Sequence, residues 1–98
     1  MSDSDDRTVV YEPESSRFAI YVDESVAYLD LQLFKDKVVF THTEVPVGLE
    51  GQGLGASLAR AGLDWARSEG LRVIPVCPFV AAYIGRHPEY LDLTKRRP

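Results

Sequence analysis

The stretch "HTEVPVGLEGQGLGASL", residues 42–58, contains the features that decide the fold of this chain. It begins as a β-branched strand, breaks at Pro46, and then has glycines at positions 48, 51, 53 and 55 before a helical pattern starts. A glycine loop between a strand and a helix can present several backbone N–H groups to one anion at the positive end of the helix dipole. Glycine also occurs in ordinary turns. The loop alone therefore leaves two interpretations open, an anion-binding site and a simple flexible connection.

Three strands are predicted at and before the start of this stretch. They are "RFAIYV" (17–22), "VAYLDLQLF" (26–34) and "VVFTHTEV" (38–45). The middle one alternates, with Ala27, Leu29, Leu31 and Leu33 expected on one face. Short turns join the three strands, which predicts an antiparallel meander.

A helix, a strand and a second helix are predicted after the glycine loop. The helical period runs from Gln52 to a stop at Gly70, and a strand follows at 71–77. A short helix is predicted at 78–86, then a turn or one more helical turn. Pro75 lacks an N–H for a ladder, so it indicates either an edge position or a strand that diverges from its neighbour.

The expected fold is therefore an α/β (α+β) domain with a mixed sheet. The order is β-β-β-α-β-α, an antiparallel meander followed by a βαβ crossover that joins parallel strands. With 98 residues we expect one domain at 16–94, a flexible acidic tail at 1–15 and a basic tail at 95–98.

Composition and charge exclude several classes of protein. The chain has no run of about 18 apolar residues and no signal-like start, so we expect a cytoplasmic protein without a membrane segment. The single cysteine, Cys77, cannot form an internal disulfide. The net charge of −4 argues against general nucleic-acid binding. It is compatible with a cationic amine substrate, or with a surface that has no partner preference.

The glycine loop also supports a family resemblance. "EGQGLGASLARAGLDWAR", residues 50–67, resembles motif A of the Gcn5-related N-acetyltransferases, Gln/Arg-x-x-Gly-x-Gly/Ala. Gly53 and Gly55 take the two glycine positions, and Glu50 replaces the usual Gln or Arg. The His-Thr-Glu-Val-Pro run, "PVCPFV" and the closing "HPEY" are similar to the compact, single-domain subgroup of that superfamily. This wider resemblance covers about residues 17 to 93.

The resemblance implies acetyl-coenzyme A as cosubstrate and no metal. In the superfamily the pyrophosphate lies on the loop at the helix start, and the pantetheine arm pairs with the strand before it. An acid beside a pyrophosphate is unfavourable unless it points away, so Glu50 fits this role poorly. The residues that the resemblance assigns to cofactor binding are Thr43, Glu44, Val45, Gly51, Gln52, Gly53, Leu54, Gly55 and Ala56.

Three residues are candidates for the chemistry. His42, with a reference pKa of about 6.5, suits a general base that deprotonates an amine, or is a structural strand residue. Cys77 is a candidate nucleophile that takes the acetyl group, or a small buried hydrophobe. Tyr83 matches the tyrosine that protonates the departing thiolate in many members, or packs as an ordinary aromatic.

We therefore predict an acetyl-coenzyme A-dependent N-acetyltransferase acting on a small amine or a protein lysine. The alternative is a non-catalytic module that binds coenzyme A or acyl-coenzyme A and acts through a protein partner. Typical members have further elements ahead of the meander, so the acceptor site is expected to be open or completed by a partner. The acceptor itself is unknown, and we expect a monomer or a weak homodimer.

Overall fold

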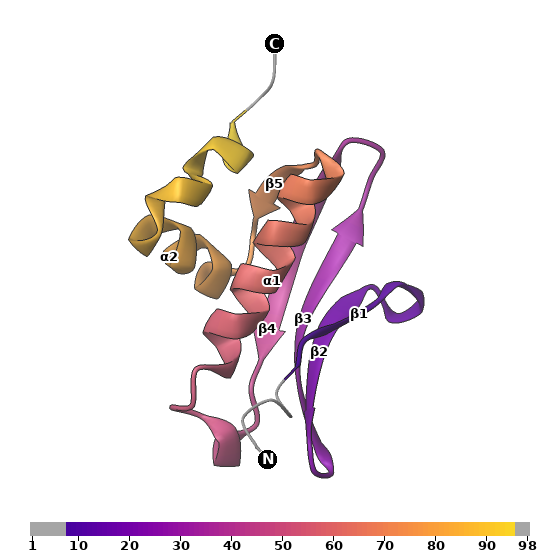
Figure 1. Ribbon diagram of the computed structural model, residues 1–98, viewed down its shortest axis with the longest axis vertical. Coiled ribbons are helices and arrows are strands. Elements are labelled where there is room, and N and C mark those ends of the chain that lie inside the picture. Colours follow the sequence, from indigo (N-terminus) through magenta and orange to yellow (C-terminus); the bar gives the residue numbers. More distant parts are fainter. Residues whose placement is uncertain (1–7, 96–98) are drawn as a thin grey trace.

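The computed structural model describes residues 8–95 of the chain, and parts of both predicted tails lie outside this range (Figure 1). Its strands are β1 (Val10–Glu12), β2 (Arg17–Val22), β3 (Ser25–Leu33), β4 (Lys37–Glu44) and β5 (Arg72–Pro75). Its α-helices are α1 (Leu54–Glu69) and α2 (Pro78–Arg86). Three 3-10 segments are η2 (Pro13–Ser15), η3 (Val47–Leu49) and η4 (Pro88–Thr94).

The strands form one mixed sheet in the order β1-β2-β3-β4-β5. The pairs β1/β2, β2/β3 and β3/β4 are antiparallel. The pair β4/β5 is parallel, with α1 between the two strands in the chain. This arrangement confirms the predicted meander followed by a βαβ crossover. α1 stops at Glu69, directly before Gly70, as the sequence indicated.

The sheet begins earlier than the sequence indicated. We expected a flexible tail up to residue 15, which is wrong for residues 10–12, because β1 pairs with β2. The cause is an aromatic cluster that the local pattern does not reveal. The Tyr11 ring stacks on Phe18 at 4.8 Å between centroids and lies 5.0 Å from the ring of Trp65 on α1. Such pairs stabilise a contact by about 0.5–1.5 kcal/mol beyond the area they bury.

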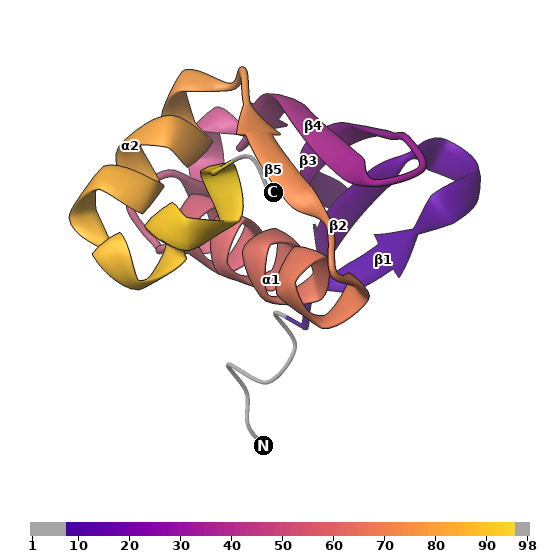
Figure 2. The same ribbon diagram turned by 90° about the horizontal axis from the view of Figure 1, so that it is seen from above.

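The core lies between α1 and one face of the sheet. Figure 2 shows α1 running along that face, with α2 beside it. Leu58 and Leu63 of α1 are fully buried against the sheet, where Phe40 is also fully buried. Burying each of these side chains stabilises the fold by about 1.5–3 kcal/mol. Gly62 lets the helix approach closely, because an added Cβ would lie 3.0 Å from the Phe40 ring.

An irregularity between β3 and β4 sets which side chains face α1. Asp30 pairs with His42, but the next residue, Leu31, pairs with Phe40, so β4 contains one extra residue at Thr41. Such a β-bulge changes the alternation of side chains along the strand. As a result Phe40 and Thr43, three positions apart, both face the helix side.

The face that Leu33 shares with Ala27, Leu29 and Leu31 is not covered along its whole length. Leu33 is 52% exposed, whereas the other three residues are buried. β2 pairs with β3 only as far as Asp30. Leu33 therefore lies beyond the end of β2 and lacks the neighbouring strand that covers Leu29.

The last segment, η4, is attached to α1 by polar contacts. The Tyr90 hydroxyl donates a hydrogen bond of 2.7 Å to Asp64 Oδ1. The Arg67 guanidinium makes two hydrogen bonds of 3.0 Å to the carboxylate of Asp92 and one of 2.8 Å to the carbonyl of Glu89. These contacts hold the C-terminal part of the described chain against the helix that follows the glycine loop.

Candidate functional site

The two parallel strands separate where the glycine loop begins. Pairing of β4 with β5 ends at Phe40 and Pro75. Beyond it, the Cys77 N–H donates a 2.8 Å hydrogen bond to the Phe40 carbonyl, and the chain then enters α2. β4 continues to Glu44 without β5 beside it. Pro75 therefore occupies the end of the ladder, where a missing N–H costs little.

The loop after β4 leaves the start of α1 open to an anion. Gly51 and Gly53 have φ values of +83° and +81°, a left-handed conformation that residues with a side chain rarely adopt. Gly53 is the N-cap residue, so no side chain caps the helix. The first N–H groups of a helix have no partner within it, and here they remain available to a ligand.

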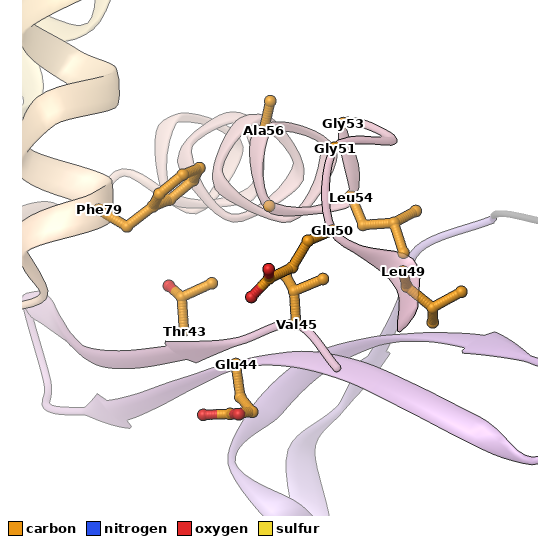
Figure 3. Close-up of a pocket in the computed structure, with 11 residues that line it drawn as sticks. Thr43, Glu44, Val45, Leu49, Glu50, Gly51, Gly53, Leu54, Ala56 and Phe79 are labelled. Atoms are coloured by element: carbon orange, nitrogen blue, oxygen red, sulfur yellow. The ribbon is translucent and has the colours of Figure 1, made fainter. Parts of the chain in front are cut away.

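A pocket of about 450 Å³ lies between this loop, the end of β4 and the start of α2. Figure 3 shows Thr43 and Val45 projecting from β4 toward α1, whereas Glu44 projects from the opposite side of the strand. The Phe79 ring closes one end from α2. The lining residues are Thr43, Glu44, Val45, Leu49, Glu50, Gly51, Gly53, Leu54, Gly55, Ala56 and Phe79.

Most residues assigned to the cofactor by resemblance line this pocket, and Gln52 does not. Leu49, Glu50 and Phe79 also line it, although none of them was assigned. The glycine at position 55 is a trace of Phe79 in the sequence, because a Cβ added at Gly55 would lie 2.8 Å from Phe79 Cζ. The sequence shows that glycine in the first helical turn, but it does not show which residue approaches it.

Cys77 lies behind the pocket. Its side chain is buried, with 3% of the residue exposed, and it does not line the pocket. The Cys77 Sγ and Thr43 Oγ1 atoms are 3.1 Å apart, a hydrogen-bond contact in which either group can donate. Thr43 therefore connects the pocket to the thiol.

His42 lies on the other face of the sheet. Its side chain is 56% exposed, and its Nε2 is 3.0 Å from Glu44 Oε1. Neighbouring residues of a strand point to opposite faces. Since Thr43 faces Cys77, the structure does not bring His42 and the thiol together. The His42 ring instead lies 6.3 Å from that of Tyr28.

Tyr83 is part of the interior of the protein rather than of the pocket wall. It is 5% exposed, and its ring stacks on His87 at 4.0 Å. The His87 Nδ1 atom is 2.9 Å from the backbone carbonyl oxygen of Tyr83, which holds the imidazole against the backbone of α2. The three candidate catalytic residues thus occupy three separate environments.

Residues 8–95 contain neither a metal-binding cluster nor a membrane-spanning helix. No group of three or more His, Cys, Asp and Glu side chains there could hold a metal ion. In the same range, no helix has both the length and the apolar character needed to cross a membrane.

Comparison with known proteins gives one consistent result. A family model described as GCN5-related N-acetyl-transferase matches residues 17–93. The protein NATD1 of Xenopus tropicalis is 33% identical over 60 residues, which are 59% of this chain and 55% of that protein. Human NATD1 is 36% identical over 53 residues, 52% of this chain and 47% of that protein. The match thus spans about half the length of these curated relatives.

A solved structure is also similar. The solution NMR structure of a GCN5-like protein from Staphylococcus aureus superposes with a TM-score of 0.70 at 25% identity. The superposition covers 90% of this chain and 87% of the other. The similarity therefore extends over nearly the whole sheet and both helices.

Proposed function

Because the chain belongs to the GCN5-related N-acetyltransferase family, we propose that it transfers an acetyl group from acetyl-coenzyme A to an amine. One observation carries the proposal: the pocket lies where β4 leaves β5 and where α1 begins with free N–H groups. The acceptor is a small amine or a protein lysine.

The residues of the pocket suit most of the cosubstrate. Val45, Leu49, Leu54 and Phe79 give apolar walls that fit a pantetheine arm. The backbone of β4 beyond Phe40 can pair with the amide groups of that arm. The start of α1 can receive phosphate groups. The Glu50 carboxylate is the one lining group that fits poorly.

Acetyl-coenzyme A supplies the acetyl group as a thioester. The attacking amine must first lose its proton, and His42 is the proposed base, with Glu44 accepting a hydrogen bond from the ring at 3.0 Å. A carboxylate in this position orients the imidazole ring. Backbone N–H groups that face the pocket are suited to polarising the thioester carbonyl.

Direct transfer to the amine is favoured over an acetylated cysteine. Cys77 is buried, and its thiol is engaged with Thr43 rather than with His42. A buried thiol that does not line the pocket is poorly placed to attack a thioester bound there. For Tyr83, a proton donor to the departing thiolate is the proposed role, and Tyr83→Phe separates that role from packing on His87.

The test measures binding and turnover separately. Calorimetry with coenzyme A is expected to show binding, and acetyl-coenzyme A with a panel of amines is expected to release free thiol. His42→Gln should abolish thiol release and leave coenzyme A binding unchanged, whereas Cys77→Ala should remain active without an acetyl adduct in the intact mass. Absence of binding at millimolar coenzyme A refutes the proposal.

A non-catalytic module that binds coenzyme A or acyl-coenzyme A is the second candidate. The separation of His42, Cys77 and Tyr83 favours it, because none of the three lines the pocket. Coenzyme A binding without thiol release over the whole amine panel would support this candidate over the first.

A further inference from the structure

Glu50 departs from the family motif, and the structure directs its side chain into the pocket. Figure 3 shows the carboxylate extending from the loop into the space between β4 and α1, toward Thr43 and Val45. Glu44 also belongs to the lining but projects from the far side of β4. Among the described lining residues, Glu50 is thus the only charged side chain that points inward.

Nothing in the described chain neutralises this charge. The pocket lining in residues 8–95 includes no Lys, Arg or His. The ion pairs of the same range join Glu12 to Arg17, Glu44 to His42 and Asp92 to Arg67, so none involves Glu50. The carboxylate therefore adds a negative charge to a pocket whose other inward-pointing polar groups are the Thr43 hydroxyl and backbone amides.

The position of this charge matters for a ligand with an uneven charge distribution. The free N–H groups of α1 attract an anion, and Glu50 is only three residues before Gly53, the N-cap. A diphosphate placed at that helix start approaches the carboxylate. Like charges repel each other, and because Glu50 is an exposed residue this repulsion is screened by solvent and salt. An uncharged pantetheine arm along β4 experiences no such repulsion.

We infer that Glu50 is a specificity-determining residue of the donor site. It lowers the affinity for the diphosphate-bearing part of coenzyme A more than the affinity for the uncharged pantetheine arm. The inference rests on the proposed function, since it requires coenzyme A in this pocket. Donor recognition in this chain consequently depends more on the apolar walls than in a protein with Gln or Arg at the same position.

The test compares two ligands across three proteins. Coenzyme A and pantetheine are titrated against wild type, Glu50→Gln and Glu69→Gln, and NMR titration gives dissociation constants into the millimolar range. Glu69→Gln is the matched control because it removes the same charge from an exposed residue at the far end of α1. That end is roughly 22 Å from the pocket, more than two Debye lengths at physiological salt.

Glu50→Gln is expected to bind coenzyme A about fivefold more tightly than wild type. Pantetheine affinity should change less than about twofold, and Glu69→Gln should resemble wild type for both ligands. Raising the salt concentration should narrow the difference for coenzyme A, because screening weakens the repulsion.

The failures are distinguishable. Equal coenzyme A affinity in wild type and Glu50→Gln overturns the inference but leaves the proposed function intact. Equal tightening for coenzyme A and pantetheine also overturns it, because Gln has nearly the same volume as Glu and the effect of the charge would then not depend on the diphosphate. If none of the three proteins binds coenzyme A, both the inference and the proposed function are wrong.

Discussion

The contact between Tyr90 and Asp64 predicts a loss of stability at alkaline pH. Tyr90 is only 7% exposed, and its hydroxyl donates to Asp64 Oδ1 at 2.7 Å. Burial, followed by this hydrogen bond, raises the pKa of Tyr90 to about 12. Both causes favour the protonated phenol in the folded state. An unfolded chain has the ordinary tyrosine pKa of about 10.

The sign and size follow from this difference in pKa. Because the folded-state pKa is raised, the stabilisation is fully present below about pH 10 and is lost as the pH rises toward 12. At pH 11 the linkage relation gives a loss of about 1.4 kcal/mol in the free energy of unfolding. Screening by the solvent at this edge of the protein reduces the expected loss to about 1 kcal/mol.

Urea denaturation followed by far-ultraviolet circular dichroism measures this loss between pH 8 and pH 11. Other groups titrate in this range, so the informative quantity is the difference between wild type and Tyr90→Phe. Wild type should be more stable by about 1 kcal/mol at pH 8, and the two should be nearly equal at pH 11. Asp64→Asn keeps an acceptor but removes its charge, so it should lose less than wild type. A difference that stays constant from pH 8 to pH 11 refutes the reasoning.

Three further predictions concern the core and the pocket. Phe40→Ala should lower the free energy of unfolding by about 3–5 kcal/mol, and Leu33→Ala should lower it by less than about 0.5 kcal/mol. Similar losses for the two variants in urea denaturation would contradict the described core. Gly55→Ala should lower the free energy of unfolding by about 1 kcal/mol through overpacking against Phe79. This loss should disappear when Gly55→Ala is made in a Phe79→Leu background, and a loss that persists there would show that the contact is not responsible. Thr43→Val should lower the free energy of unfolding by about 1 kcal/mol, because the thiol then lacks its hydrogen bond. Thr43→Ser should retain most of the stability, and equal losses for the two variants would mean that the hydroxyl contributes nothing.

The sequence predicted the regular elements well because their signals are local. The alternation in β3, the β-branched residues of β4 and the spacing in α1 each reflect one buried face, which the chain must have wherever the element packs. Pro75 indicated either an edge position or a strand that diverges from its neighbour, and in the structure it is the last paired residue of β5.

The sequence missed features that depend on contacts between distant segments. β1 is three residues long and is stabilised through Tyr11, whose partners are Phe18 and Trp65. No pattern within three residues reveals such a cluster. Phe79 reaches the pocket from α2, which lies beside α1 only in the folded chain.

The candidate site likewise has one part with a local sequence signal and one part that depends on contacts between distant segments. The glycine loop is continuous in sequence, so its place at the pocket could be predicted from the chain. His42 and Cys77 lie 35 positions apart, and their relation depends on the extra residue at Thr41. That bulge places Thr43 beside the thiol and His42 on the opposite face, an outcome that alternation along β4 alone does not specify.

The aromatic cluster at β1 also gives the protein a built-in optical reporter. Trp65 is the only tryptophan in the chain, and its ring is in contact with Tyr11 and Phe18. It lies eleven residues after Leu54, roughly 16 Å along α1 from the pocket. Its fluorescence therefore follows detachment of the first strand from the helix. A ligand in the pocket changes the emission only where its binding is transmitted along α1 to that strand.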